Sequence, residues 1–212
     1  MKSWWIAVVW AVSAPLVASA EVILSEINYA PPTDGQDTEF IEILNLGPGP
    51  ADLSGWYWDG ITLTVPDGTV LAPGGFLVAA FELIDTTDTN TLSFESFYGN
   101  DDGVADEFAY AILDYSGGLL DAGELIALRD AADQIIDSFD YSALVADNPD
   151  RRSLERHSAA PGDFVVGTVD GGTPGSSEVP LAAVPEPVSL ALILPALLLV
   201  CGPLTRHPRR RR

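Results

Sequence analysis

Short apolar segments separated by turns rich in glycine and proline make up most of the chain between residues 21 and 184. Strands are expected at residues 22–29, 40–44, 56–58, 61–65, 69–71, 76–81, 124–128 and 134–141. Residues 130–133 are typical of a hairpin loop. No long segment has the period of a helix, so the sequence predicts an all-β protein built as a β-sandwich.

The N-terminal end has the composition of an export signal. Lys2 precedes an apolar stretch at 4–10, and Ala18 and Ala20 form an A-x-A cleavage site. Residues 1–20 are therefore predicted to be a signal peptide that is cut after Ala20. An uncleaved anchor is the alternative, and the shortness of the apolar stretch argues against it.

The C-terminal end, residues 188–212, is predicted to be a hydrophobic helix followed by an arginine-rich tail. Residues 188–204 carry no charge over 17 positions, just short of the ~20 residues that span a bilayer comfortably. Five arginines follow, at 206 and 209–212. Positive charge retained in the cytoplasm would place the preceding chain outside the membrane. The arginines therefore fit a stop-transfer flank better than a nucleic-acid-binding patch.

A Pro-Glu-Pro motif, Pro185, Glu186 and Pro187, closes a linker predicted at 179–187. The order of Pro-Glu-Pro, apolar helix and terminal arginines resembles the PEP-CTERM sorting signal. That resemblance implies recognition and cutting near the motif by exosortase-type processing machinery. It also implies transient membrane anchoring through the helix, and a final location at the cell surface, the outer membrane or the extracellular matrix.

The region between the two signals is strongly acidic. The 212 residues together carry a formal net charge of −21, but residues 21–184 contain four arginines, no lysine and 30 acidic side chains, a net of −26. This balance argues against nucleic acid as a partner, because phosphate backbones are held by clustered lysine and arginine. The one cysteine, Cys201, cannot form an internal disulfide, so packing must stabilise the domain.

A series of motifs resembles the lamin tail domain family, in the order found in that family. The motifs are Ser25-Glu26-Ile27, Glu39-Phe40-Ile41-Glu42-Ile43, Asp52-Leu53-Ser54-Gly55-Trp56, Leu71-Ala72-Pro73-Gly74-Gly75-Phe76, Gly123-Glu124-Leu125-Ile126, Ser153-Leu154-Glu155-Arg156 and Gly172-Thr173-Pro174-Gly175. The resemblance covers most of a domain predicted at 21–178. It implies an immunoglobulin-like β-sandwich, often found in secreted or surface modules, and it implies no catalytic residues.

Local chemistry gives several motif residues structural roles. Trp56 is expected to fill the core, since a buried aromatic side chain dominates packing in a small sandwich. Gly55 is expected to supply a backbone angle that larger residues avoid. Asn45 and Asp52 are expected to satisfy loop amides. The segment 153–156 is expected to return the chain to the sandwich, with Leu154 packed and Glu155 or Arg156 in an ion pair. Exposed pairs of that type contribute about 0–1 kcal/mol.

One acidic loop carries the oxygen ligands that Ca²⁺ prefers. Asn100, Asp102 and Asp106 follow an N-x-D-G-x-x-D spacing, and Glu107 comes next. The loop is shorter than an EF-hand loop and lacks its distal bidentate glutamate. It is therefore a candidate Ca²⁺ site, and a plain solvated turn is the favoured interpretation.

No enzyme and no other cofactor are predicted. His157 is the only histidine in the 21–184 region, and no nucleophile pattern surrounds it. Acidic pairs are too abundant to indicate glycoside cleavage. The favoured hypothesis is an exported, non-catalytic cell-surface or matrix module that binds a protein or polysaccharide. The alternative is a secreted Ca²⁺-dependent adhesin or hydrolase that uses the loop at 100–107.

Overall fold

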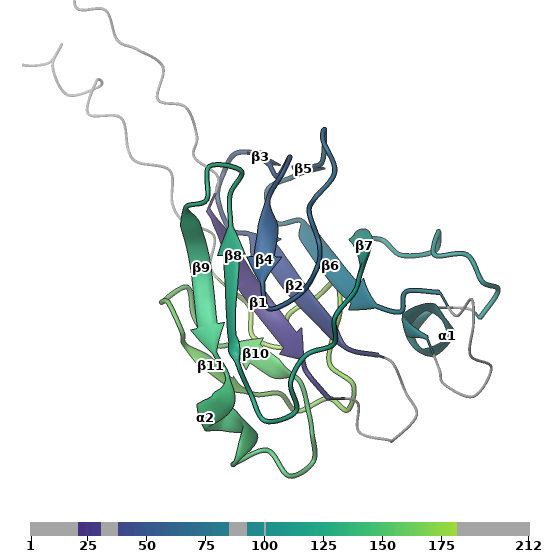
Figure 1. Ribbon diagram of the computed structural model, residues 1–212, viewed down its shortest axis with the longest axis vertical. Helices are drawn as coiled ribbons and strands as arrows, with labels where there is room; N and C mark the ends of the chain where they lie inside the picture. The colour runs from purple at the N-terminus through teal and green to yellow at the C-terminus, as the bar shows by residue number, and fades with distance from the viewer. Residues whose placement is uncertain (1–20, 31–37, 85–92, 100, 182–212) are drawn as a thin grey trace, which may run out of the picture. The chain divides into compact units, whose positions relative to one another are not determined.

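The computed structural model describes residues 21–30, 38–84, 93–99 and 101–181, which all lie in one compact unit, Ala18–Pro185 (Figure 1). The predicted signal peptide with Ala18 and Ala20, the Pro-Glu-Pro motif and the predicted C-terminal helix lie outside these ranges. No helix within them is long and apolar enough to cross a membrane.

Short strands dominate the described chain, and two short helices accompany them. The strands are β1 (Val22–Asn28), β2 (Phe40–Asn45), β3 (Ala51–Asp52), β4 (Tyr57–Asp59), β5 (Val70–Leu71), β6 (Phe76–Phe81), β7 (Ala111–Tyr115), β8 (Leu125–Arg129), β9 (Ile135–Asp140), β10 (Leu154–Arg156) and β11 (Phe164–Val166). The helices are α1 (Phe94–Tyr98) and α2 (Ser142–Val145). The predicted all-β class is confirmed.

Two sheets face each other across the main core. The larger has the order β11-β10-β1-β2-β6-β7, and only its β6–β7 pair is parallel. The smaller, β4-β8-β9, lies over β1 and β2 in Figure 1, and β3 pairs with β5 beside them. The core between the sheets includes Leu24, Ile41, Leu77 and Leu128, all fully buried. This arrangement is the predicted β-sandwich.

Most predicted strands agree with the structure to within one or two residues, and the strand expected at 76–81 is β6 itself. The strand expected at 61–65 is wrong. Its residues form only isolated bridges, Tyr57 with Thr64 and Thr62 with Ser116. Thr62 and Thr64 meet different partners, so neither bridge continues into a ladder.

The prediction for Trp56 is also wrong, because the tryptophan in the core is Trp58. Trp58 points inward from β4 and is 2% exposed, whereas Trp56 precedes the strand and is half-buried at the edge of the core. The roles expected of Gly55, Asn45 and Asp52 are confirmed. Gly55 has a φ of +73°. The Asn45 side chain bonds the backbone of Gly47, and Asp52 accepts a hydrogen bond from the Ser54 amide.

The outer face of the larger sheet, which points away from the main core, is covered as well. One apolar cluster there includes Phe40 and Val78 with Phe94 of α1, and another includes Ile23 and Leu44 with Leu181. Residues 171–178, named here the C-terminal strap, cross this face between the two clusters, as their hydrogen bonds to β1 and β2 show. Polar side chains of the sheet are therefore sealed beneath the strap.

Candidate functional site

Three glutamates stand side by side on the outer face of the larger sheet. Glu26 of β1 is paired with Glu42 of β2 on one side and with Glu155 of β10 on the other. Their exposed fractions are 0, 0 and 1%. Neighbouring strands lie about 4.8 Å apart, so the three side chains belong to one row, named here the acid cluster.

A β-bulge in β1 brings Glu26 into this row. The register shifts between Leu24 and Glu26, so Ser25 is an extra residue in β1. Leu24 therefore points into the main core, while Glu26 points to the opposite face, and the Ser25 hydroxyl donates to Glu42 at 2.7 Å. The bulge also releases the Leu24 amide from the ladder, and Asp137 accepts its hydrogen bond at 3.0 Å.

The C-terminal strap is bonded directly to the acid cluster. The Thr173 amide donates to both oxygens of Glu26, at 3.0 and 3.2 Å, and the Thr173 hydroxyl donates to Glu155 at 3.0 Å. The Gly175 amide donates to Glu42 at 2.5 Å. Two backbone amides and one hydroxyl of the strap therefore depend on these three carboxyl groups.

Burial makes the acid cluster retain protons. Burial, together with the charges of Glu155 and Glu42, raises the pKa of Glu26 well above its usual range. Burial raises the pKa of Glu42 to about 8 and also raises that of Glu155. In the described part of the chain no arginine or histidine forms an ion pair with any of the three.

Two buried oxygens at the cluster lack a hydrogen-bond partner among the described residues. They are the Ser153 hydroxyl and Oε2 of Glu155. Gly172 closes the strap over them with a φ of +84°. A Cβ at position 172 would collide with Oε1 of Glu26 and lie 2.9 Å from the Ser153 hydroxyl, so only glycine fits.

Gly172→Ala is expected to destabilise the protein by about 2–3 kcal/mol, because it adds a collision with the acid cluster to the ~1–2 kcal/mol cost of a left-handed backbone. Gly162→Ala is the matched control. Gly162 has a φ of +71°, and a Cβ there would meet nothing within 4 Å. Urea unfolding measures the free energy of unfolding of both variants. Equal losses for the two would show that strap closure over the cluster contributes nothing.

A cavity of about 490 Å³ lies at one end of the larger sheet. Its walls include Leu44, Leu46, Phe76 and Leu181, and among the described residues no acidic or basic side chain lines it. The acid cluster, conversely, has such groups but is closed under the strap.

The candidate Ca²⁺ ligands lie in a loop that is tied to α1. Asn100 lies outside the described residues. Asp102, Asp106 and Glu107 are exposed. The amides of Asp102 and Gly103 donate to Glu95, a buried carboxylate for which the sequence pattern gives no signal. Within the described ranges, no group of three histidine, cysteine or acidic side chains is placed to hold a metal ion.

The Ca²⁺ site stays a prediction, and thermal unfolding tests it. A site at this loop requires the melting temperature to rise in millimolar Ca²⁺ relative to chelator, by several degrees for a stabilisation of about 2–3 kcal/mol. Asp102→Ala should abolish the rise, whereas Asp67→Ala, at another exposed turn, should preserve it. An identical melting temperature with Ca²⁺ and with chelator contradicts the site.

The ion pair expected at 153–156 is present and Leu154 is packed as expected, but the pair is buried and not of the exposed type. Arg156 is 1% exposed and donates to Asp137 at 3.0 Å. Its guanidinium also lies over the ring of Phe164, 5.1 Å from the centroid. Glu155 points the other way and joins the acid cluster. Adjacent residues of a strand face opposite sides of a sheet, and here both sides are covered.

Comparison with known proteins gives the family. No curated protein matches the chain. The model of the family described as Lamin Tail Domain matches residues 17–143, more than half of the 212 residues. The match includes Glu26 and Glu42, whereas Glu155 and the strap lie beyond it. The chain therefore belongs to the lamin tail domain family.

Proposed function

We propose that this protein is an exported, non-catalytic interaction module of the cell surface or extracellular matrix. The observation that carries the proposal is the pairing of its few cations. Arg129 is bonded to Asp59, Arg151 to Asp121, Arg152 to Asp170 and Arg156 to Asp137. All four arginines of the 21–184 region are thus engaged with aspartates, and most of the 30 acids have no arginine to neutralise them.

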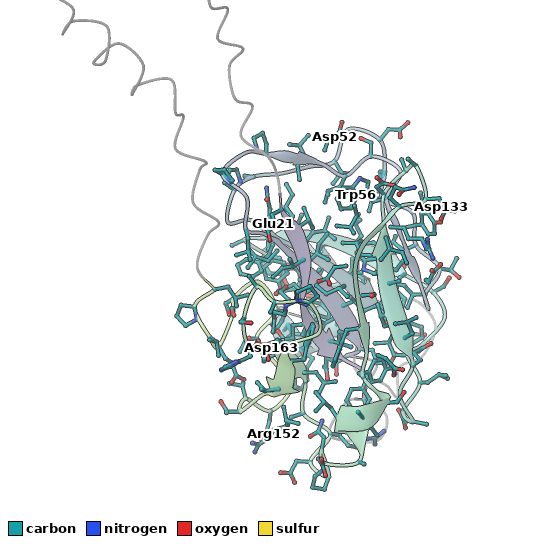
Figure 2. All side chains as sticks on the ribbon, turned by 90° about the vertical axis from the view of Figure 1, so that its left-hand side faces the viewer. Glu21, Asp52, Trp56, Asp133, Arg152 and Asp163 are labelled. Carbon is teal, nitrogen blue, oxygen red and sulfur yellow. The ribbon has the colours of Figure 1, made fainter. Side chains whose placement is uncertain are left out.

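The acidic surface supports a binding role. Asp52 and Asp133 are exposed and lie at the surface of the domain (Figure 2). A strongly negative domain stays soluble and attracts cationic groups, directly or through divalent cations. The partner is therefore a protein with basic residues, or a polysaccharide bound through divalent cations. Among the described carboxyl groups, those with a raised pKa lie beneath the strap, where a bound substrate does not reach them.

The route to the surface belongs to the same proposal. Cleavage after Ala20 releases the domain from the export machinery, and the helix at 188–204 holds it in the membrane. Exosortase-type machinery then cuts near Pro185, Glu186 and Pro187. Support comes from the order of these signals in the sequence and from a folded unit that fits between them.

Intact-mass analysis of protein recovered from its own cells tests the route. The expected mass begins at Glu21 and ends near Pro185, in the surface or extracellular fraction. Recovery from the cytoplasm with Met1 or Lys2 still present would refute export. A species retaining the arginine tail at the surface would refute cleavage.

Co-sedimentation with isolated surface material tests the binding role. Binding to a basic partner is expected to weaken steeply between about 0.05 and 1 M salt, over which the Debye length shrinks several-fold. Hydrolysis of a polysaccharide panel by the purified protein, lost on substitution of a single acidic side chain, would instead show that it is an enzyme.

A further inference from the structure

The acid cluster has no role in the proposed function, and its geometry requires an explanation. Three carboxyl groups on adjacent strands are almost completely buried, and no described cation pairs with them. Three full negative charges at this spacing in a low-dielectric layer would repel one another strongly. Something positive must therefore accompany the closed state.

The unpartnered oxygen of Glu155 indicates that this positive species is a proton. Oε2 of Glu155 is buried and has no donor among the described residues. An ionised oxygen without a donor is unfavourable in such a place, whereas a protonated Oε2 becomes a donor to the neighbouring Glu26. A proton held between Glu26 and Glu155 thus removes one charge and supplies the missing hydrogen bond.

The attachment of the strap depends on the same carboxyl groups. Thr173 and Gly175 are bonded to the cluster, and at its start the Gly171 carbonyl accepts hydrogen bonds from Asn28 and Tyr98. A strap that lifts away admits water to the cluster, and water stabilises the ionised carboxylates. Ionisation and opening therefore favour each other.

We propose that Glu26, Glu42 and Glu155 form a proton-binding site that latches the C-terminal strap: protonation keeps the strap closed, and deprotonation releases it. The strap precedes the segment that carries the Pro-Glu-Pro motif, so the latch sets how firmly that end of the domain is held. The inference is independent of the proposed function.

The groups that surround the cluster favour retention of the proton. From the strap side, Glu178 faces Glu155, and from α1 and the segment before β7, Tyr98 and Tyr110 approach Glu26 and Glu42. Glu107 lies beyond Tyr110. Arg152 is the cation on this side, but it acts on Glu178 and is bonded to Asp170. Apart from Arg152 these neighbours are negative or neutral, and none of those named supplies a counter-charge to the cluster itself.

Carbon-13 NMR of the glutamate carboxyl carbons in the purified chain tests the site directly. At least one carboxyl of the cluster is expected to titrate above pH 7, while exposed glutamates titrate near 4.3. Titration of every glutamate below about pH 5.5 would overturn the proposal. This measurement needs no variant, so it decides the question even if a substitution prevents folding.

Hydrogen exchange of the Thr173 and Gly175 amides tests the latch. After correction for intrinsic exchange, their opening constant is expected to rise by up to about tenfold per pH unit between pH 6 and 8. Glu155→Gln imitates the protonated state, because its amide nitrogen donates to Glu26 while its oxygen still accepts from Thr173. The variant should open far less at high pH, and Asp67→Asn, at an exposed turn, should behave as the original protein does.

Three results would overturn the latch. The first is strap protection that does not change with pH, and the second is a Glu155→Gln variant with the same pH dependence as the original protein. The third is full restoration of protection at pH 9 by millimolar Ca²⁺, which would show that the cluster binds a metal cation and not a proton.

Discussion

Replacing Asp137 with alanine is expected to lower the free energy of unfolding by about 3–5 kcal/mol, the loss typical of breaking a buried ion pair from one side. Asp137 of β9 is 7% exposed, and its carboxylate joins the two sheets. It accepts from the Arg156 guanidinium of β10 and from the Leu24 amide that the bulge in β1 releases, both at 3.0 Å. Without it, the buried guanidinium loses its counter-ion and keeps only carbonyl acceptors, and the buried Leu24 amide loses its acceptor.

The matched control is Asp121→Ala. Asp121 pairs with Arg151 at 2.8 Å, but its side chain is 67% exposed, so its removal should cost no more than about 1 kcal/mol. Urea unfolding gives both values. The double variant Asp137→Leu with Arg156→Met tests the cause, since it removes both charges and should be less destabilising than Asp137→Ala. Equal losses for Asp137→Ala and Asp121→Ala would show that the buried pair does not join the sheets.

The fold was predictable because its signals are local. Alternating apolar residues and the turns around Gly68, Gly74 and residues 130–133 specify strands and hairpins over a few positions each, and β6, β8 and β9 lie close to where the pattern puts them. The strand expected at 61–65 fails for a nonlocal reason. A strand needs several consecutive residues paired with one neighbouring strand, and these residues form only isolated bridges to two different segments.

The acid cluster was not predictable from periodicity. In an unbroken strand, Glu26 would share a face with Leu24 and point into the main core, where a carboxyl group is unfavourable. The bulge that reverses this assignment has no glycine or other marker in the sequence. Glu42 was visible as the one charged residue in an apolar strand, but a central strand with one polar position is as readily explained by an exposed face.

Sequence patterns do not predict the strap either, because its contacts join residues that are far apart in the chain. Thr173 and Glu26 are 147 residues apart, and the Gly-Thr-Pro-Gly segment looks like an ordinary loop. What the sequence does contain is Gly172, whose missing side chain makes the closure possible. The burial of Glu155 and Arg156 was not predictable either. Adjacent charged residues usually indicate a solvent-exposed edge, whereas here the two side chains are buried on opposite faces of the sheet.

Stability is expected to fall as the pH rises from about 4.5 to about 8. The carboxyl of Glu42 has a pKa of about 8 in the folded protein against 4.5 as its ordinary value, so between these values the folded state binds more protons than the unfolded state. Stability must then decrease with rising pH. At 1.36 kcal/mol per pKa unit the gap gives an upper limit of roughly 5 kcal/mol for this group alone.

Other carboxyl groups act in a different window. Burial raises the pKa of Glu178, but hydrogen bonds from Thr168 and Val169 outweigh it, so the net shift is downward. Its contribution is present above its ordinary pKa and is lost as the pH falls below that value. It therefore does not cancel the decline between pH 4.5 and 8. Repulsion among the exposed acidic side chains also lowers stability, but these groups are almost fully ionised by pH 6. A further loss of stability between pH 6 and 8 is therefore caused by the buried groups.

Glu42→Gln separates the buried carboxyl from the general charge. The glutamine oxygen can accept from the Gly175 amide. Its nitrogen can donate to the Ser25 hydroxyl, which then accepts where it donates to Glu42 in the original protein, so the packing is retained. The variant should be more stable than the original protein at pH 9 and should lose less stability between pH 6 and 8. Asp67→Asn, at an exposed turn, should keep the original slope. Because both changes remove one acid, a flatter curve for Glu42→Gln alone assigns the pH dependence to burial, and parallel curves for both variants refute that assignment.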